Sequence, residues 1–411
     1  MTQRVRGRIL AFVAGALFAP VAAGAAGNIE AIVKGGNLVI TGDDEGNYLT
    51  IDQAGLSPGE LRITPGVGTT LNGVAAAAVF SGVTKGIVAT LAGGNDTLLC
   101  DSLSLPGDVK LDGGDLDDSV VLEGTFGGDA KVDLGDGENS FFLDPGSQLT
   151  GKLTLRSGDG GDSVVLNGGA TIVGAVKLDL GDGVNTSFFD PGSSVGGAVS
   201  IKGRDGSDSS FLSASIAGDV RLVLGDGVNE VFLNAGQLAG SLSFKGKDGT
   251  DRLHLNGAAV ISEDLKLGLG DGSNEVIFNL ASEVTGSVTF KGTNGNDLLF
   301  LYAVVGGNLK LTLGSGENEV YLNPMSSVGG DLVVKVGGDR DIVFVDQATL
   351  LGNAQLIVSH GMNEITCTDS PVTGNLTIKA GSGDDSVDTT GTTVGGQTKI
   401  DADGGTNTIV P

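Results

Sequence analysis

The sequence predicts an all-β protein, a single-chain right-handed parallel β-helix (β-solenoid) of about 22 residues per coil. Three observations predict it. A Gly-rich turn that ends in Asp or Asn recurs at nearly constant spacing, apolar residues alternate with polar ones on both sides of that turn, and helical spacing of apolar residues is absent. Right-handed winding is the usual hand for parallel strands joined by crossovers.

The residue that ends each Gly-rich turn defines an anchor position. Successive anchors are 21 to 23 residues apart, and Asp96 precedes the series by one coil. Short strands between such turns cannot bury a face alone, but stacked copies about 4.8 Å apart share one continuous core. The anchors are Asp118, Asn139, Asp162, Asn185, Asp208, Asn229, Asp251, Asn274, Asp297, Asn318, Asp341, Asn363, Asp385 and Asn407.

Alternation around each anchor indicates which side chains point inward. Val176 and Leu178 lie two apart before Asn185, and Val164 and Leu166 occupy the second and fourth positions after Asp162. These positions predict the core. Both cysteines, Cys100 and Cys367, occupy the fourth position after an anchor. We therefore expect two buried thiols, twelve coils or roughly 58 Å apart, which is too far for a disulfide.

The chain divides into three segments. Residues 1–26 are predicted to be a signal peptide, because Arg4, Arg6 and Arg8 precede an apolar stretch and a run of small residues. Residues 27–95 are expected to form an N-terminal cap and irregular first coils, and residues 96–411 the regular solenoid. The predicted location is secreted, cell-surface or periplasmic, and no later segment is apolar over the length that crosses a bilayer.

Charge and composition exclude some functions. The net charge is −26, which disfavours nucleic acid as a partner. Almost every acidic residue belongs to the repeat, and His254 and His360 lie in different coils, so no catalytic residue is predicted and we expect no enzyme. A polysaccharide lyase or hydrolase is the lesser alternative, because the fold alone leaves catalysis open.

A second column of acidic residues lies three positions before the anchors. Neighbouring carboxylates about 4.8 Å apart repel by roughly 0.9 kcal/mol even in water. Two explanations are open: bound cations, or the nearby bases Arg204, Lys202, Lys245 and Lys247. We call this set the outer acidic column: Asp115, Asp136, Asp159, Asp182, Asp205, Asp226, Asp248 and Asp271.

The corner from Gly203 to Phe211 resembles the hemolysin-type (RTX) calcium-binding repeat, G-G-x-G-x-D-x-apolar-x. The resemblance implies Ca²⁺ as a cofactor between coils, with Asp162, Asp208 and Asp251 as ligands beside the outer acidic column. The turn recurs every 22 residues here and not every nine, so only one corner of each coil carries the motif. A purely structural corner is the alternative, because alternating Asp and Asn anchors can hydrogen-bond to one another without a metal.

A row of aromatic residues occupies the third position after the anchors and is predicted to face outward. We interpret it as an interaction surface for self-association or for a cell-wall or polysaccharide component. The structural alternative is that stacked rings stabilise each other, or that a bulge turns some of them inward. The row consists of Phe142, Phe188, Phe211, Phe232, Phe300, Tyr321 and Phe344.

Together these features predict a non-enzymatic exported β-solenoid that serves as a cell-surface, adhesive or extracellular-matrix structural protein. Two alternatives stay open. One is a calcium-binding, RTX-like repeat protein whose folding depends on the ion, and the other is a carbohydrate-binding or carbohydrate-active β-helix.

Overall fold

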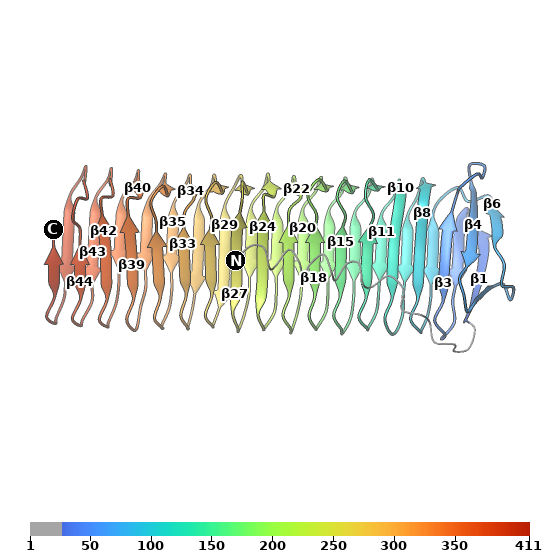
Figure 1. Ribbon diagram of the computed structural model, residues 1–411, viewed down its shortest axis with the longest axis horizontal. Coiled ribbons are helices and arrows are strands. Elements are labelled where there is room, and N and C mark those ends of the chain that lie inside the picture. Colours follow the sequence, from blue (N-terminus) through green and yellow to red (C-terminus); the bar gives the residue numbers. More distant parts are fainter. Residues whose placement is uncertain (1–26) are drawn as a thin grey trace.

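The computed structural model describes residues 27–411, so the predicted signal peptide lies outside the described residues. These residues form a straight rod in which the chain repeats the same circuit along the long axis (Figure 1). The predicted all-β parallel solenoid of about 22 residues per coil is confirmed, with about 15 coils. Stacked about 4.8 Å apart, these coils give a rod roughly 70 Å long.

The first face of the rod is a parallel sheet that receives one strand from each coil. Its strands are β2 (Asn37–Thr41), β7 (Ile87–Thr90), β9 (Val109–Asp112), β11 (Ala130–Asp133), β14 (Leu153–Arg156), β17 (Val176–Asp179), β20 (Val199–Lys202), β23 (Val220–Val223), β26 (Leu242–Lys245), β29 (Leu265–Gly270), β32 (Val288–Gly292), β35 (Leu309–Thr312), β38 (Leu332–Lys335), β41 (Ala354–Ile357), β43 (Leu376–Ala380) and β45 (Thr398–Ala402).

The second face follows the anchor corner and is also parallel along the stack. Its strands are β3 (Tyr48–Asp52), β8 (Thr97–Leu105), β10 (Ser119–Phe126), β12 (Ser140–Leu143), β15 (Ser163–Leu166), β18 (Thr186–Phe189), β21 (Ser209–Leu212), β24 (Asn229–Asn234), β27 (Asp251–Asn256), β30 (Glu275–Phe278), β33 (Leu298–Leu301), β36 (Glu319–Leu322), β39 (Ile342–Asp346), β42 (Glu364–Thr368), β44 (Ser386–Asp388) and β46 (Thr408–Val410).

The third face is narrow, with two residues per coil, and the ends of β8 and β10 join it. Its strands are β13 (Gln148–Leu149), β16 (Thr171–Ile172), β19 (Ser194–Val195), β22 (Ser215–Ile216), β25 (Gln237–Leu238), β28 (Val260–Ile261), β31 (Glu283–Val284), β34 (Val304–Val305), β37 (Ser327–Val328) and β40 (Thr349–Leu350).

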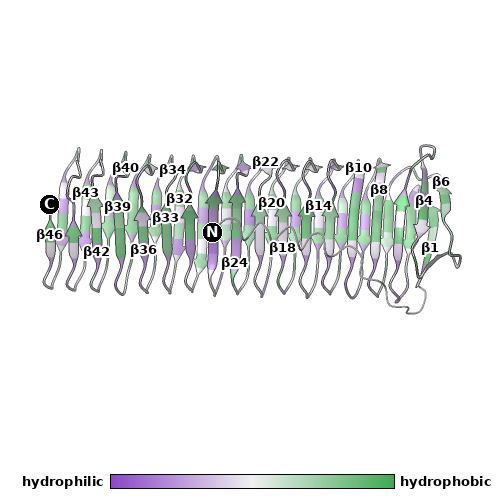
Figure 2. Ribbon diagram, viewed as in Figure 1, coloured by the Kyte–Doolittle hydropathy of each residue, from purple (hydrophilic) through white to green (hydrophobic). Residues whose placement is uncertain are grey.

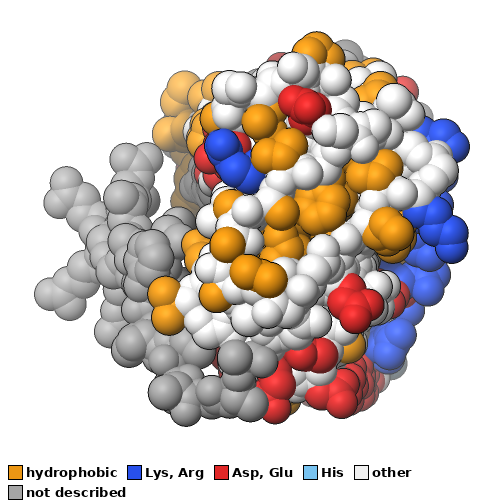
Figure 3. Space-filling view, turned by 90° about the vertical axis from the view of Figure 1, so that its right-hand side faces the viewer, with side chains coloured by type: hydrophobic (Ala, Val, Ile, Leu, Met, Phe, Trp, Pro, Cys, Tyr) orange, Lys and Arg blue, Asp and Glu red, His pale blue; other side chains and the backbone are white. Residues whose placement is uncertain are grey.

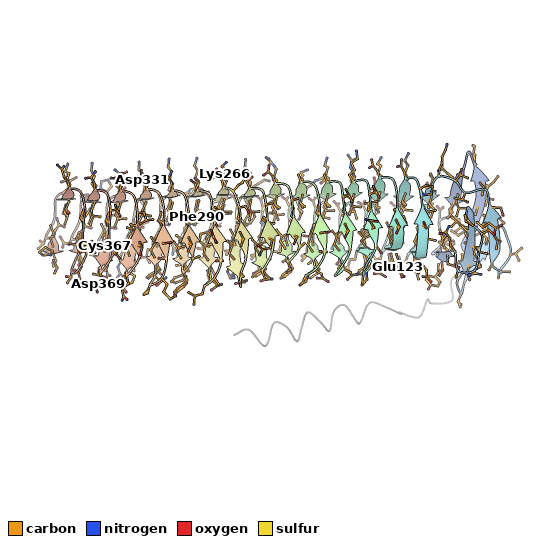
Figure 4. All side chains as sticks on the ribbon, turned by 90° about the horizontal axis from the view of Figure 1, so that it is seen from above. Glu123, Lys266, Phe290, Asp331, Cys367 and Asp369 are labelled. Atoms are coloured by element: carbon orange, nitrogen blue, oxygen red, sulfur yellow. The ribbon has the colours of Figure 1, made fainter. Side chains whose placement is uncertain are left out.

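Equivalent side chains stack directly from coil to coil. Val176 pairs with Val199 and Leu178 with Ile201 in neighbouring strands, and all four are buried. Burying one such side chain contributes about 1.5–3 kcal/mol, and the sum along the rod stabilises the stack. Hydrophobic residues alternate with polar ones along the strands (Figure 2), and Phe290 of β32 lies inside the rod while Lys266 of β29 projects outside (Figure 4).

A glycine column shapes the anchor corner. Gly183, Gly206 and Gly227, two residues before their anchors, have φ values of 115°, 132° and 119°. A Cβ on Gly206 would lie 1.8 Å from the carbonyl oxygen of Gly183 in the preceding coil. Glycine is therefore required both by its left-handed backbone and by the close approach of the coils.

The N-terminal end differs from the rest of the rod. There β1 (Gly27–Lys34) pairs antiparallel with β2, β4 (Glu60–Pro65) pairs antiparallel with both β3 and β6 (Ala78–Ser81), and β5 (Thr69–Leu71) pairs with β1. Parallel stacking begins with β2 on β7 and β3 on β8. The segment 27–95 thus contains antiparallel strands at the blue end of Figure 1, together with the first coil.

Both cysteines lie in the core as free thiols, as Cys367 in Figure 4 illustrates. Burial raises the pKa of Cys100 to about 12 and that of Cys367 to about 11, so both remain protonated and act as small hydrophobic residues. Between residues 27 and 411, no helix has the length and apolar character needed to traverse a bilayer.

Candidate functional surfaces

The anchors form a buried hydrogen-bonded ladder along one corner of the rod. The backbone N–H of Asp162 donates to Oδ1 of Asn185 at 3.0 Å, that of Asn185 to Oδ1 of Asp208 at 3.2 Å, and that of Asp208 to Oδ1 of Asn229 at 3.1 Å. The pattern runs from Asn47 to Asn407. At Asn229 the side-chain Nδ2 makes the contact, donating to Oδ1 of Asp251 at 2.8 Å. Each anchor therefore holds its coil in register with the next.

Asn and Asp anchors differ in the terminal atom that does not accept the ladder hydrogen bond, which is Nδ2 in Asn and Oδ2 in Asp. The Nδ2 of Asn318 donates to the corner carbonyls of Gly314 and Gly316 at 3.1 and 3.0 Å. The Oδ2 atoms of the Asp anchors are buried without a hydrogen-bond donor. In the coil of Asp208, Oδ2 lies 1.8 Å from where a Cβ on Gly203 would stand. The Asp anchors therefore carry one buried oxygen that accepts no hydrogen bond from the described residues.

Burial raises the pKa of most Asp anchors. It raises the pKa of Asp208 and Asp297 to about 6 and that of Asp251 to about 7, because desolvation disfavours the carboxylate. Asp96 and Asp118 are consecutive anchors with no Asn between them. Burial, with repulsion between the two, raises the pKa of Asp96 to about 8, and burial raises that of Asp118 to about 7. Part of this ladder is therefore protonated near neutral pH.

The outer acidic column lies at the same corner but faces solvent. The backbone N–H of Asp159 donates to Oδ1 of Asp136 at 2.9 Å, and that of Asp205 to Oδ1 of Asp182 at 3.3 Å. At Asp271 the carboxylate accepts from the hydroxyl of Thr293, which is the main reason that its pKa is lowered. Neutral donors from the next coil therefore stabilise three of the eight carboxylates, those of Asp136, Asp182 and Asp271.

The nearby bases form fewer ion pairs with the outer acidic column than the sequence suggested. Lys247 Nζ lies 3.7 Å from an oxygen of Asp226, so one predicted ion pair with the column is present. Lys202 instead pairs with Asp179 on the first face, at 3.6 Å. Arg204 and Lys245 make no ion pair within residues 27–411. Backbone N–H groups and a hydroxyl group instead donate hydrogen bonds to some of the carboxylates that the bases were expected to neutralise. The sequence does not reveal these donors.

The predicted calcium ligands are not gathered into a cage. Asp162, Asp208 and Asp251 use Oδ1 to accept a hydrogen bond from the ladder. Their unpartnered Oδ2 atoms recur only in every second coil, roughly 9.6 Å apart, so one ion cannot bridge two of them. Over the described part of the chain, no three His, Cys, Asp or Glu residues converge as a metal site would require. The carboxylates of these residues therefore do not by themselves supply the six to eight oxygens that Ca²⁺ takes.

The aromatic row lies on the outer side of the second face, where its rings are half-buried. Phe188 and Phe211 stack with ring centroids 4.8 Å apart, and Phe211 and Phe232 at 5.1 Å, both with planes 9° apart. Phe300 and Tyr321 form a second stack at 4.8 Å. Neighbouring rings thus cover one another, and each such pair contributes about 0.5–1.5 kcal/mol beyond area burial.

The remaining members of the row, and the side chains beside it, complete this surface. Phe344 tilts 49° to Tyr321, while Phe142 pairs in register with Val165, which is buried. Between the two stacks stand His254 and Ile277. An asparagine ladder runs alongside: Asn256 Nδ2 donates to Asn234 Oδ1 at 2.9 Å. The row is a ridge of ordered rings flanked by polar side chains.

Neither histidine belongs to a catalytic set. His254 contacts Glu275 at 3.0 Å with no nucleophile joined to the pair, and His360 contacts Ser382 at 2.6 Å with no orienting acid. A nucleophile, a base and an orienting group are not brought together at either place.

The sequence interpretation missed a basic surface on the first face. From Asn139 to Asn407, coils anchored by Asn carry a base eight residues before the anchor, and coils anchored by Asp carry one six residues before it; the coil of Asn363, with Gln355 at this position, is the exception. The sequence contains a signal for this surface, because the position of the base alternates with the same two-coil period as the Asp and Asn anchors. The residues that follow it are Lys131, Arg156, Lys177, Lys202, Arg221, Lys245, Lys266, Lys291, Lys310, Lys335, Lys379 and Lys399.

Comparison with known proteins assigns the chain to no family. No family model matches it, and no curated protein matches it. A solved structure that is similar is the X-ray crystal structure of a hyperactive, Ca²⁺-dependent, β-helical antifreeze protein from an Antarctic bacterium, with 16% identity, a TM-score of 0.41, and 79% of this chain and 80% of that chain covered. That likeness is too distant to indicate what this chain binds.

Proposed function

We propose that this protein is an exported, non-enzymatic rod that serves as a structural component of a cell surface, an adhesive layer or an extracellular matrix. One observation carries the proposal: about 15 coils share a single core and ladder without interruption, so the outward side chains repeat as straight rows along the whole rod. A surface made of repeated rows suits multivalent contact, because each added coil presents the same group again.

The architecture also suits a mechanical role. Each strand hydrogen-bonds to its copies in the coils on both sides, the anchor ladder adds a buried bond per coil, and stacked rings reinforce the second face. Contacts between adjacent coils therefore make up most of the interactions in the rod. The stiffness of the rod comes from many similar coil-to-coil contacts and not from one site.

The two alternatives have less support. Ion-dependent folding requires a cage that the predicted ligands do not form, and a carbohydrate-active enzyme requires acidic and basic groups gathered in a cleft. Carbohydrate binding without turnover is compatible with the rod and is taken further below.

Localisation tests the proposal directly. An epitope placed in the exposed turn between β5 and β6 should be cleaved by protease added to intact cells or be recovered from the medium, while a cytoplasmic marker stays protected. Full-length protein retained with the cytoplasmic marker would contradict export. Release of new reducing ends from acidic polysaccharides by the purified rod would contradict the non-enzymatic assignment.

A further inference from the structure

The C-terminal two thirds of the first face carry an array of positive charge. One basic side chain projects from each strand from β20 to β38, and another from β43, and every one of them is exposed while its neighbours in the strand are buried. We call these residues the basic rows: Lys202, Arg221, Lys245, Lys266, Lys291, Lys310, Lys335 and Lys379.

The basic rows contrast with the rest of the molecule. The net charge of the chain is −26, yet no acidic side chain occupies an outward position on the strands that carry the rows. The other outward positions hold glycine or small hydroxyl or aliphatic side chains, such as Ser200, Thr289 and Val333. Seen along the axis, Lys and Arg gather on one side of the rod and Asp and Glu at the adjoining corner (Figure 3).

Most of these bases have no ion-pair partner. Lys202 pairs with Asp179 at 3.6 Å and Lys266 with Asp264 at 3.4 Å, whereas the other members of the rows make none within the described residues. Bases in adjacent coils stand two residues apart along the strand, so their Cα atoms are roughly 8 Å apart. Like charges at this distance repel by about 0.5 kcal/mol per pair in water. An anionic occupant would relieve that repulsion.

We propose that the basic rows bind a linear acidic polysaccharide that lies along the rod axis. The geometry fits a long, thin polyanion, because the two rows are about 6.6 Å apart and continue in a straight line from coil to coil. Each base would face a carboxylate or sulfate of the glycan, and the small side chains between the bases leave the sheet flat. This inference names the partner of the proposed matrix or surface role and rests on that role for access to an extracellular glycan.

Two observations favour a polysaccharide over a nucleic acid. The outward positions of the strands that carry the rows hold no aromatic side chain, and single-stranded nucleic acids are held by bases stacked on aromatic residues. A wide duplex would in addition meet the outer acidic column beside the N-terminal half of the rows. That column ends at Asp271, so the segment with Lys291, Lys310, Lys335 and Lys379 should hold the glycan most strongly.

The test uses the purified chain and polygalacturonate as the acidic polysaccharide, with neutral dextran for comparison. The test variant changes Lys291, Lys310, Lys335 and Lys379 to Gln. The control changes Lys34, Lys85, Lys152 and Lys247 to Gln, an equal loss of charge from exposed lysines elsewhere. We expect the test variant to lose at least about tenfold in affinity for polygalacturonate at low salt and the control less than about threefold, because only the test variant removes charge that the glycan contacts. Replacing the four test lysines with Arg should retain binding.

Several outcomes would overturn the proposal. They are an equal loss in both Gln variants, binding of dextran, tighter binding of duplex DNA than of polygalacturonate, or a low-salt oligomer of the rod that the test variant abolishes. The last result would assign the rows to the outer acidic column of a second copy. Because binding is measured on purified protein, its failure is separate from a failure of the localisation experiment.

Discussion

Two columns of acidic residues lie three positions apart at one corner of the rod, and the protein treats them in opposite ways. The Asp anchors are buried and keep one oxygen without a donor, and burial raises the pKa of most of them, as at Asp251. The outer acidic column faces solvent and accepts hydrogen bonds from the next coil, and the pKa of Asp271 is lowered. The same side chain, at the same repeat, thus sets register when buried and acts as a solvated acceptor when exposed.

The difference in burial between the anchors and the outer acidic column indicates that the fold depends on the anchors. Removing a buried anchor leaves backbone groups unsatisfied inside the corner, and water cannot reach them. Removing an outer carboxylate leaves donors that water can satisfy. This contrast leads to four experiments, which are ordered by the size of the change that each should produce.

The largest effect should come from Asn318→Ala. Asn318 accepts from the backbone N–H of Asp297 and donates to Asp341 and to two corner carbonyls, so alanine leaves several buried groups without partners. We expect the free energy of unfolding in urea, followed by far-UV circular dichroism, to fall by about 3 kcal/mol. The matched control is Asp248→Ala in the outer acidic column, which should change it by less than about 0.5 kcal/mol. Equal losses would refute the distinction between the columns.

The next effect is on pH dependence. Asp96, Asp118, Asp208, Asp251 and Asp297 have pKa values of about 6 to 8 when folded against an ordinary value of 3.8, so the folded state binds more protons than the unfolded state between those values. Their stabilising contribution is complete below about pH 4 and is lost as the pH rises through 6 to 8. Thermal unfolding should therefore show a Tm that falls by several degrees between pH 5 and pH 9.

Replacing Asp208, Asp251 and Asp297 together with Asn should flatten that fall, since the carboxamide is neutral at every pH and already serves at alternate anchors. A Tm that rises with pH in the unmodified protein would show that the anchors are stabilised as carboxylates.

A smaller effect is expected from neutralising the outer acidic column. Asp205→Asn combined with Asp248→Asn removes like-charge repulsion along the exposed column, and the free energy of unfolding should rise by a few tenths of a kcal/mol at low ionic strength. The gain should vanish in 1 M salt, where the Debye length is about 3 Å. A gain that persists at high salt would have to come from something other than charge.

The smallest effect should be that of chelation. Because neither column forms a calcium cage, the Tm in excess EDTA should equal the Tm in excess Ca²⁺ within error. An ion bound at one hundred times its Kd would stabilise the fold by about 2.7 kcal/mol, which is easily measured as a shift in Tm. A clear upward shift with Ca²⁺ would restore the ion-dependent alternative.

The sequence was sufficient for the fold because one rule, the anchor spacing with its flanking alternation, applies in every coil. Val164, Leu166, Val176 and Leu178 are buried as that rule requires. The irregular end was harder to predict, because β4 and β6 pair antiparallel through turns that carry no repeat signal. A local sequence pattern can identify a strand. At the N-terminal end, however, packing against the first coil decides whether that strand pairs parallel or antiparallel.

The surfaces were predicted less completely than the fold. The outward position of Phe188 and Phe211 followed from alternation, but the stacking of their rings depends on side-chain rotamers that a sequence does not specify. Lys202 and Lys245 were candidates to neutralise the outer acidic column, but they project from the first face. The alternation of apolar and polar residues does not indicate what an exposed charged side chain contacts. Its partners can be identified only from the positions of neighbouring coils.

The two-coil period of the anchors has a consequence for how such a rod can change length. Inserting or deleting a pair of coils restores every Asp to an Asn neighbour and keeps the lysines in step. Loss of one Asn-anchored coil, or gain of one Asp-anchored coil, brings two acidic anchors together, as at Asp96 and Asp118, where the Asp96 pKa reaches about 8. Duplication in pairs is thus the tolerated step for growth by recombination, and a designer who extends the rod should add coils two at a time.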